Sequence, residues 1–140
     1  MSIKELENLA RLGHLQPEPP AQQEIDGLLT SGVRRLQDAE NTSLSLESRF
    51  DLAYNAAHAL ALAGLRLRGY RSKNRYTVFQ VLPHTLGIES AKWRVLDQAH
   101  NKRNRSEYDG SFDVDIALVE AVMRVAREIE AAVRALGPVK

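Results

Sequence analysis

The stretch from Leu46 to Leu67 constrains the fold of this chain most strongly. Its apolar and small residues recur at alternating steps of four and three, the spacing of one face of an α-helix: Leu46, Phe50, Ala53, Ala57, Leu60, Gly64 and Leu67. Leu52, Ala56, Ala63 and Leu65 extend the apolar surface to the other faces. A helix that is apolar on so many sides is surrounded by other helices, so this stretch predicts a central helix that stops at Gly69.

Helical patterns of the same kind occupy most of the remaining chain. They predict further helices over about 2–12, 20–36, 74–86, 89–109 and 113–136. The expected end signals are the capping box Ser2-Ile3-Lys4-Glu5, an N-cap for the central helix among Asn41, Thr42 and Ser43, a left-handed cap at Gly110, and an N-cap at Ser111 or Asp113. No segment alternates in the sustained manner of a β-strand. We therefore predict an all-α fold, an antiparallel bundle of four to five helices with an extra short N-terminal helix.

Length and composition limit the domain organisation and the kind of site. A chain of 140 residues, 44% of them hydrophobic, suits a single domain over residues 1–140, with N-terminal helices in 1–42 and a core bundle in 43–140. Because the chain has no cysteine, disulfides and thiolate metal sites are excluded. The most apolar stretch, 52–65, is too short to span a bilayer and contains Asn55 and His58, so we expect a soluble, cytoplasmic protein with no membrane segment.

Charge is distributed unevenly along the sequence. The net charge is only +1, yet ten basic residues face two acidic ones between positions 66 and 105, which gives this segment a net charge of +8 and the remainder −7. The ten are Arg66, Arg68, Arg71, Lys73, Arg75, Lys92, Arg94, Lys102, Arg103 and Arg105. One interpretation is that these side chains only solubilise helix surfaces. The other is that the basic half binds an anion such as RNA or a nucleotide.

Residues 99–110 (Ala-His-Asn-Lys-Arg-Asn-Arg-Ser-Glu-Tyr-Asp-Gly) place polar groups where a core stripe should continue. At about 100° per residue, the apolar face of Trp93, Leu96 and Ala99 continues as His100, Arg103, Asn104 and Glu107, with Tyr108 at its edge and Lys102 and Arg105 pointing away. Charged groups on such a face cost desolvation free energy unless they pair, or unless they open onto a cleft or a subunit interface. We therefore take Arg103, Asn104, Tyr108 and His100 as the candidate site.

A second polar row runs along the predicted central helix. Asp51, Asn55 and His58 follow one another at steps of four and three, so they share a face of that helix. The row is either a partly buried network in which His58 is satisfied internally, or a second wall of the site. The four histidines, at 14, 58, 84 and 100, lack metal-ligand spacing, and the chain has no glycine-rich phosphate loop, so we predict no metal and no cofactor.

Arg103-Asn104 followed by Tyr108 in a penultimate helix, together with the long helix through Leu65 that ends at Gly69-Tyr70, resembles the HEPN family (higher eukaryotes and prokaryotes nucleotide-binding). The resemblance covers roughly residues 43 to 136. It implies a bundle of four to five helices, usually a homodimer with the family motif Arg-Asn-x-x-x-His near the two-fold axis. It also implies an RNA- or nucleotide-directed function. Active members are metal-independent ribonucleases, often toxins paired with a nucleotidyltransferase antitoxin, and other members are non-catalytic binding modules.

Tyr108 departs from this motif, because it stands where the family has histidine. In metal-free RNA cleavage Arg103 could stabilise the phosphorane and Asn104 could orient the substrate. Tyr108, with an ordinary pKa of about 10, would be a poor base but could donate a proton. His100 lies one turn before Arg103 and could take the role of the missing motif histidine.

Three interpretations remain open: a metal-independent endoribonuclease, a module that binds RNA, a nucleotide or a partner protein without cutting, and a structural dimer. Under the first two, further binding contacts would come from Lys102, Arg105, Glu107, Asp51, Asn55 and His58. A symmetric homodimer would explain a polar motif on an apolar-facing stripe, since two copies of Arg103, Asn104 and Tyr108 would line one basic groove. Arg103 would then pair with Glu107 at the i, i+4 spacing or with carboxylates of the second copy.

Overall fold

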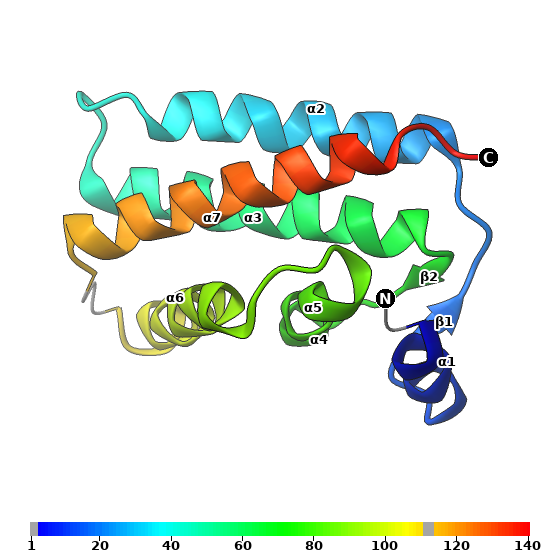
Figure 1. Ribbon diagram of the computed structural model, residues 1–140. Coiled ribbons are helices and arrows are strands. Elements are labelled where there is room, and N and C mark those ends of the chain that lie inside the picture. Colours follow the sequence, from blue (N-terminus) through cyan, green and yellow to red (C-terminus); the bar gives the residue numbers. More distant parts are fainter. Residues whose placement is uncertain (1–2, 111–113) are drawn as a thin grey trace.

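The computed structural model describes the backbone of residues 3–110 and 114–140 and the side chains of residues 4–106, 110 and 114–140. Within these residues it contains helices α1 (Ile3–Arg11), α2 (Gln22–Ala39), α3 (Leu46–Leu67), α4 (Arg75–Gln80), α5 (Leu82–Thr85), α6 (Ser90–Asp109) and α7 (Ile116–Leu136), and two-residue strands β1 (Gln16–Pro17) and β2 (Tyr70–Arg71) (Figure 1). The predicted all-α helical bundle is confirmed. No described helix combines the length and the apolar character needed to cross a membrane.

Helix α3 is the centre of the bundle, as its sequence predicts. Helices α2 and α7 pack along it, while α4, α5 and α6 lie on its other side (Figure 1). Small residues allow this close packing: a Cβ atom added to Gly32 of α2 would lie only 2.6 Å from Cγ of the fully buried Leu60 of α3. The core therefore depends on the Ala- and Gly-rich surface of α3.

Several element boundaries differ from the predicted ones. The segment 74–86 forms two helices, because the backbone leaves the helical conformation at Val81 and Pro83 lies in the first turn of α5; proline lacks an N–H and suits a helix start. The N-cap of α3 is Ser45, which accepts a hydrogen bond from the Ser48 N–H at 3.1 Å.

The predicted end of α6 is confirmed, whereas the predicted start of α7 is not. Gly110 ends α6 with a φ of 73°, as predicted. The N-cap of α7 is Asp115, whose carboxylate accepts a hydrogen bond from the Leu118 N–H at 2.9 Å. The predicted caps Ser111 and Asp113 are therefore wrong for this helix; they lie outside the described residues, as does Ser2 of the predicted capping box.

A buried arginine fastens the N-terminal segment to α3. The side chain of Arg66 is 1% exposed, and its guanidinium donates to Oε1 of Glu24 at 2.8 Å and to the backbone carbonyls of Glu18 (2.9 Å), Pro19 (2.8 Å) and Tyr70 (3.2 Å). The antiparallel ladder between β1 and β2 lies at the same place. Sequence periodicity does not predict this ladder, because two residues are too short to show alternation.

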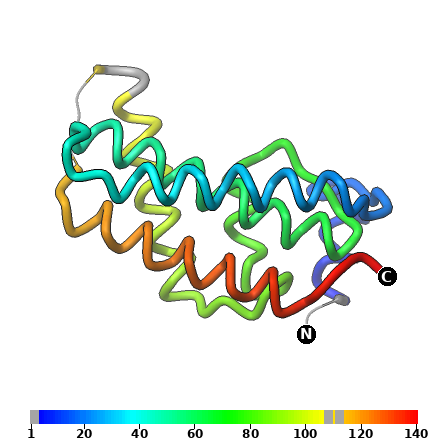
Figure 2. The backbone as a smooth tube through the Cα atoms, turned by 90° about the horizontal axis from the view of Figure 1, so that it is seen from above, coloured from blue at the N-terminus to red at the C-terminus, as the bar shows by residue number. Residues whose placement is uncertain are grey.

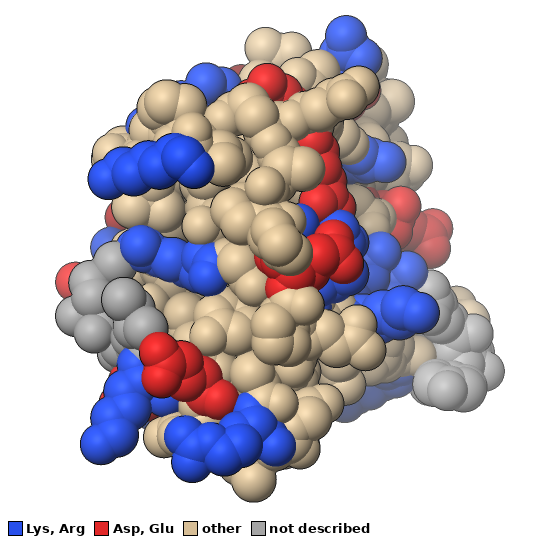
Figure 3. Space-filling view, turned by 90° about the vertical axis from the view of Figure 1, so that its right-hand side faces the viewer, with Lys and Arg blue, Asp and Glu red and all other residues tan. Residues whose placement is uncertain are grey.

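Part of the basic segment 66–105 is paired with acidic side chains. Arg71 pairs with Glu18 at 2.9 Å and with Glu24 at 2.6 Å, and Lys92 pairs with Glu128 at 2.9 Å. Figure 3 views the end of the molecule that carries α1 and the two strands, and acidic and basic side chains lie interspersed on it. Acidic groups from elsewhere in the chain thus offset part of the positive charge of the basic segment, and the paired cations are less suited to bind an anion.

Helix α6 crosses the other long helices. Figure 1 shows it almost end-on, whereas Figure 2 shows it lengthwise. Its inner face begins with the fully buried Leu96 and Ala99 and continues with half-buried His100, Arg103 and Asn104. The polar continuation of the core stripe is therefore confirmed for these residues.

Candidate functional site

Tyr54, on α3, is the centre of a group of polar and cationic side chains from three helices. Its ring is fully buried, and the guanidinium carbons of Arg75 from α4 and Arg103 from α6 lie 5.5 Å and 5.1 Å from the ring centroid. Because the face of an aromatic ring is electron-rich, it attracts cations, so both guanidinium groups contact Tyr54 favourably. We call Tyr54, Asn55, His58, Arg75, His100, Arg103 and Asn104 the Tyr54 cluster.

His100 links Tyr54 to the motif on α6. Its Nδ1 lies 2.8 Å from the Tyr54 hydroxyl, and its Nε2 lies 3.2 Å from Nδ2 of Asn104. A neutral imidazole satisfies both contacts, since one ring nitrogen donates and the other accepts. Burial lowers the pKa of His100 below its ordinary value of 6.5; Asp97 opposes this shift, and Arg103 and Arg75 add to it. His100 is therefore neutral at pH 7.

Arg75 joins the cluster from the first turn of α4. Asn74 caps this helix, with its side chain accepting a hydrogen bond from the Thr77 N–H at 3.1 Å, and so fixes the direction in which Arg75 leaves the backbone. The Arg75 guanidinium donates to Oδ1 of Asn55 at 2.9 Å. The polar row of α3 and the motif of α6 thus belong to one site, with Arg75 between them.

The positive charges of the cluster contribute to a lowered pKa of His58. Its ring meets the ring of Phe79 edge-on at 6.0 Å. Burial lowers its pKa to about 4, and Arg75, Arg103 and His100 contribute to the shift. A group with this pKa stays neutral near pH 7, so His58 lies beside Phe79 as an uncharged imidazole.

The remaining predicted site residues lie less centrally. Asp51 is exposed, and its backbone carbonyl accepts a hydrogen bond from the Asn55 side chain at 2.9 Å. Lys102 is half-buried and Arg105 is exposed. The side chains of Glu107 and Tyr108 lie outside the described residues.

An aromatic pair adjoins the cluster. Tyr76, which follows Arg75, is 37% exposed; its ring meets Trp93 of α6 edge-on at 5.9 Å and lies 6.3 Å from the His100 ring. Sequence reasoning did not place Tyr54, Arg75 or Tyr76 in the site. The available signal was an Arg-Tyr pair directly after the helix cap Asn74 in the most basic part of the chain.

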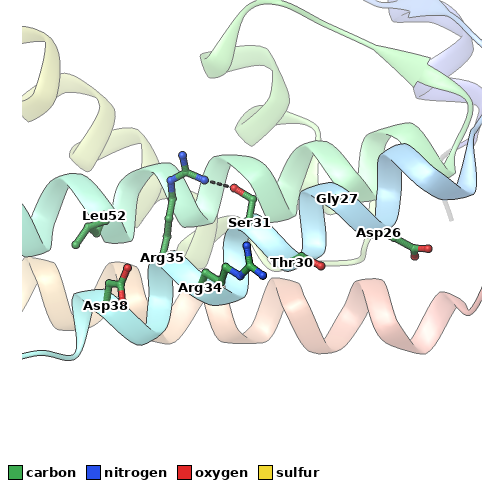
Figure 4. Close-up of a pocket in the computed structure, with 8 residues that line it drawn as sticks. All are labelled: Asp26, Gly27, Thr30, Ser31, Arg34, Arg35, Asp38 and Leu52. Carbon is green, nitrogen blue, oxygen red and sulfur yellow. Dashed lines mark hydrogen bonds between the residues drawn. The ribbon is translucent and has the colours of Figure 1, made fainter.

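A separate hollow lies on the opposite side of the bundle. It has a volume of about 700 Å³ and is lined by residues of α2 and by Leu52 of α3: Asp26, Gly27, Thr30, Ser31, Arg34, Arg35, Asp38 and Leu52 (Figure 4). Arg35 donates a hydrogen bond to Ser31 across one helical turn. The hollow is open, carries charges of both signs, and shares no residue with the Tyr54 cluster.

The Tyr54 cluster suits an anion better than a metal. Among the described residues, no three histidine, aspartate or glutamate side chains gather as metal ligands. Arginine forks, amides and a neutral imidazole are groups that hydrogen-bond phosphate oxygens. Comparison with protein-family models, with curated proteins and with solved structures finds no match to this chain, so the HEPN resemblance rests on the sequence motif and on the helix that precedes it.

Proposed function

We propose that this chain is a HEPN-like, RNA- or nucleotide-directed protein and that the Tyr54 cluster binds phosphate. The observation that carries this proposal is the approach of Arg75 and Arg103, from different helices, to the same buried ring at 5.5 Å and 5.1 Å. Both guanidinium groups carry a positive charge in a partly buried place, where electrostatic interactions are stronger than in water. A phosphate bound beside this ring could accept charge-assisted hydrogen bonds from them.

The two histidines report the same electrostatic environment. Burial is the main cause of the lowered pKa of His58 and His100; Arg75 and Arg103 lower both further, while Asp97 opposes the shift at His100. Asn55 and Asn104 add amide groups that can bond phosphate oxygens or the 2′-hydroxyl of RNA. The proposed ligand is therefore a phosphodiester or a nucleotide.

Metal-independent RNA cleavage is the second candidate, because a neutral imidazole lies one turn from Arg103. His100 could accept the 2′-hydroxyl proton only if the substrate displaced Asn104 from Nε2, since Tyr54 and Asn104 contact its two ring nitrogens. A chain that binds without cutting would keep these contacts. In a toxin-like role the partner would be a nucleotidyltransferase antitoxin.

The binding proposal is tested with a short, fluorescently labelled single-stranded RNA and measurement of anisotropy. Arg103→Gln and Arg75→Gln should each weaken binding by at least about tenfold and reduce the dependence of log affinity on log salt by about one. Arg34→Gln, which removes an exposed cation on α2, is the matched control and should change affinity little. Equal affinities for all four proteins, each folded by circular dichroism, would refute the proposal.

The cleavage alternative needs a separate assay. Labelled RNA is incubated in EDTA with the wild-type protein or with Arg103→Ala. A ribonuclease of this class would cut the RNA as wild type, and the variant would not. Intact RNA at protein concentrations that saturate binding would assign the chain to the non-catalytic class. Toxicity on induced expression that Arg103→Ala removes would support the toxin-like role.

We also propose a symmetric homodimer that brings two copies of the motif together. The motif face of α6 is a suitable surface, because it carries half-buried polar residues such as Arg103 and Asn104 that a second copy would cover. Sedimentation at micromolar concentration should give twice the chain mass of 15.7 kDa. A species of 15.7 kDa alone would exclude the dimer.

A further inference from the structure

We infer that Tyr76 is a stacking surface for an unpaired nucleobase and that the ligand class is therefore single-stranded RNA. This inference deepens the proposed function, since it needs the ligand's phosphate to lie on Arg75 and Arg103. Its basis is the position of an exposed aromatic side chain directly beside the cationic cluster.

Tyr76 contacts two neighbouring rings and is partly exposed. Its ring contacts Trp93 edge-on at 5.9 Å and lies 6.3 Å from the ring of His100, yet 37% of the residue remains exposed. Trp93 is itself half-buried against the core. The ring thus loses little conformational freedom when a ligand packs on it, which favours binding.

The sequence position of Tyr76 ties the two contacts together. Arg75 and Tyr76 are consecutive residues of the first turn of α4, whose start is fixed by the Asn74 cap. The Arg75 side chain points to Asn55 and the Tyr54 ring, while the Tyr76 ring points to Trp93 and His100. One short, capped segment therefore presents a cation and an aromatic ring to neighbouring parts of the same site.

This combination is the one that proteins use for single strands. A cationic groove follows the backbone phosphates, and an aromatic side chain stacks on a base, whose faces are exposed only when it is unpaired. A duplex hides those faces, so it could use only the cations. If Tyr76 only covered Trp93, its removal would not change the difference in affinity between a ligand with bases and one without them.

The experiment compares a short oligoadenylate with an abasic ribose-phosphate chain of the same length. The wild-type protein should bind the oligoadenylate at least about fivefold more tightly than the abasic chain. Tyr76→Ala should remove this preference without changing the affinity for the abasic chain, and Tyr76→Phe should keep it. Ile116→Ala, which removes an exposed apolar side chain of α7 (44% exposed), is a control that should behave as wild type.

The single tryptophan of the chain provides a second readout. Because Trp93 contacts Tyr76, its fluorescence should change on binding the oligoadenylate and not on binding the abasic chain. Equal wild-type affinity for both probes would overturn the inference while leaving phosphate binding intact. Failure to bind either probe would overturn both proposals, and a preference that survives in Tyr76→Ala would place the base elsewhere and refute the role of Tyr76.

Discussion

Replacing Arg66 by methionine should destabilise the protein more than any exposed arginine substitution. Methionine keeps much of the apolar stem but removes the guanidinium, which leaves the carbonyls of Glu18, Pro19 and Tyr70 and the Glu24 carboxylate without this donor. The Arg66 side chain is 1% exposed, so water does not replace the donor easily. Arg71 still pairs with Glu24, but each buried carbonyl left without a donor typically costs about 1–3 kcal/mol.

Three carbonyls lose this donor, so the expected loss for Arg66→Met is about 3–5 kcal/mol in the free energy of unfolding, or about 10–20 °C in Tm for a chain of this length. Urea unfolding followed by far-ultraviolet circular dichroism measures it, with an unchanged m-value as the check that compactness is preserved. Arg34→Met, on the exposed surface of α2, is the control and should stay within about 0.5 kcal/mol of wild type. A loss below about 1 kcal/mol for Arg66→Met would refute the view that this arginine fastens the N-terminal segment.

Two further predictions concern packing and pH. Gly32→Ala should cost about 1–3 kcal/mol, because its Cβ would lie 2.6 Å from the buried Leu60 side chain, whereas Gly27→Ala on the same helix meets nothing within 4 Å and should stabilise by about 0.5–1 kcal/mol in thermal unfolding. Because the pKa of His58 is lowered from 6.5 to about 4, the unfolded chain binds its proton first, and stability should fall by up to about 3 kcal/mol as the pH drops from 6.5 to 4. His58→Gln should flatten this slope; an unchanged slope would contradict the assigned pKa.

Helical periodicity in the sequence predicted most of the helices of the fold. The apolar spacing from Leu46 to Leu67 predicted a central helix, and that helix is the most buried of the bundle. Periodicity could not predict the break at Val81, where helical spacing continues but Pro83 favours a new helix start. It also could not identify Asp115 as the N-cap of α7, since several residues before that helix can cap equally well.

The sequence predicted only part of the candidate site. The projected stripe brought His100, Arg103 and Asn104 to one inward face, which the structure confirms. Arg75 and Tyr54 join them through tertiary contacts between separate helices, and no spacing rule within one helix reveals such contacts. Arg66 illustrates the opposite error, because a residue counted as part of a basic surface is fully buried in a structural network.

The proposed binding of phosphate at the Tyr54 cluster is tested most directly by nuclear magnetic resonance of the histidine side chains. The chain has four histidines, and His58 and His100 belong to the cluster, whereas His14 is exposed near the end of α1. Titration with short single-stranded RNA at pH 7 should shift the ring resonances of His58 and His100 at the concentrations at which binding occurs and leave those of His14 unchanged. Saturable RNA binding with no change at His58 and His100 would contradict the proposal.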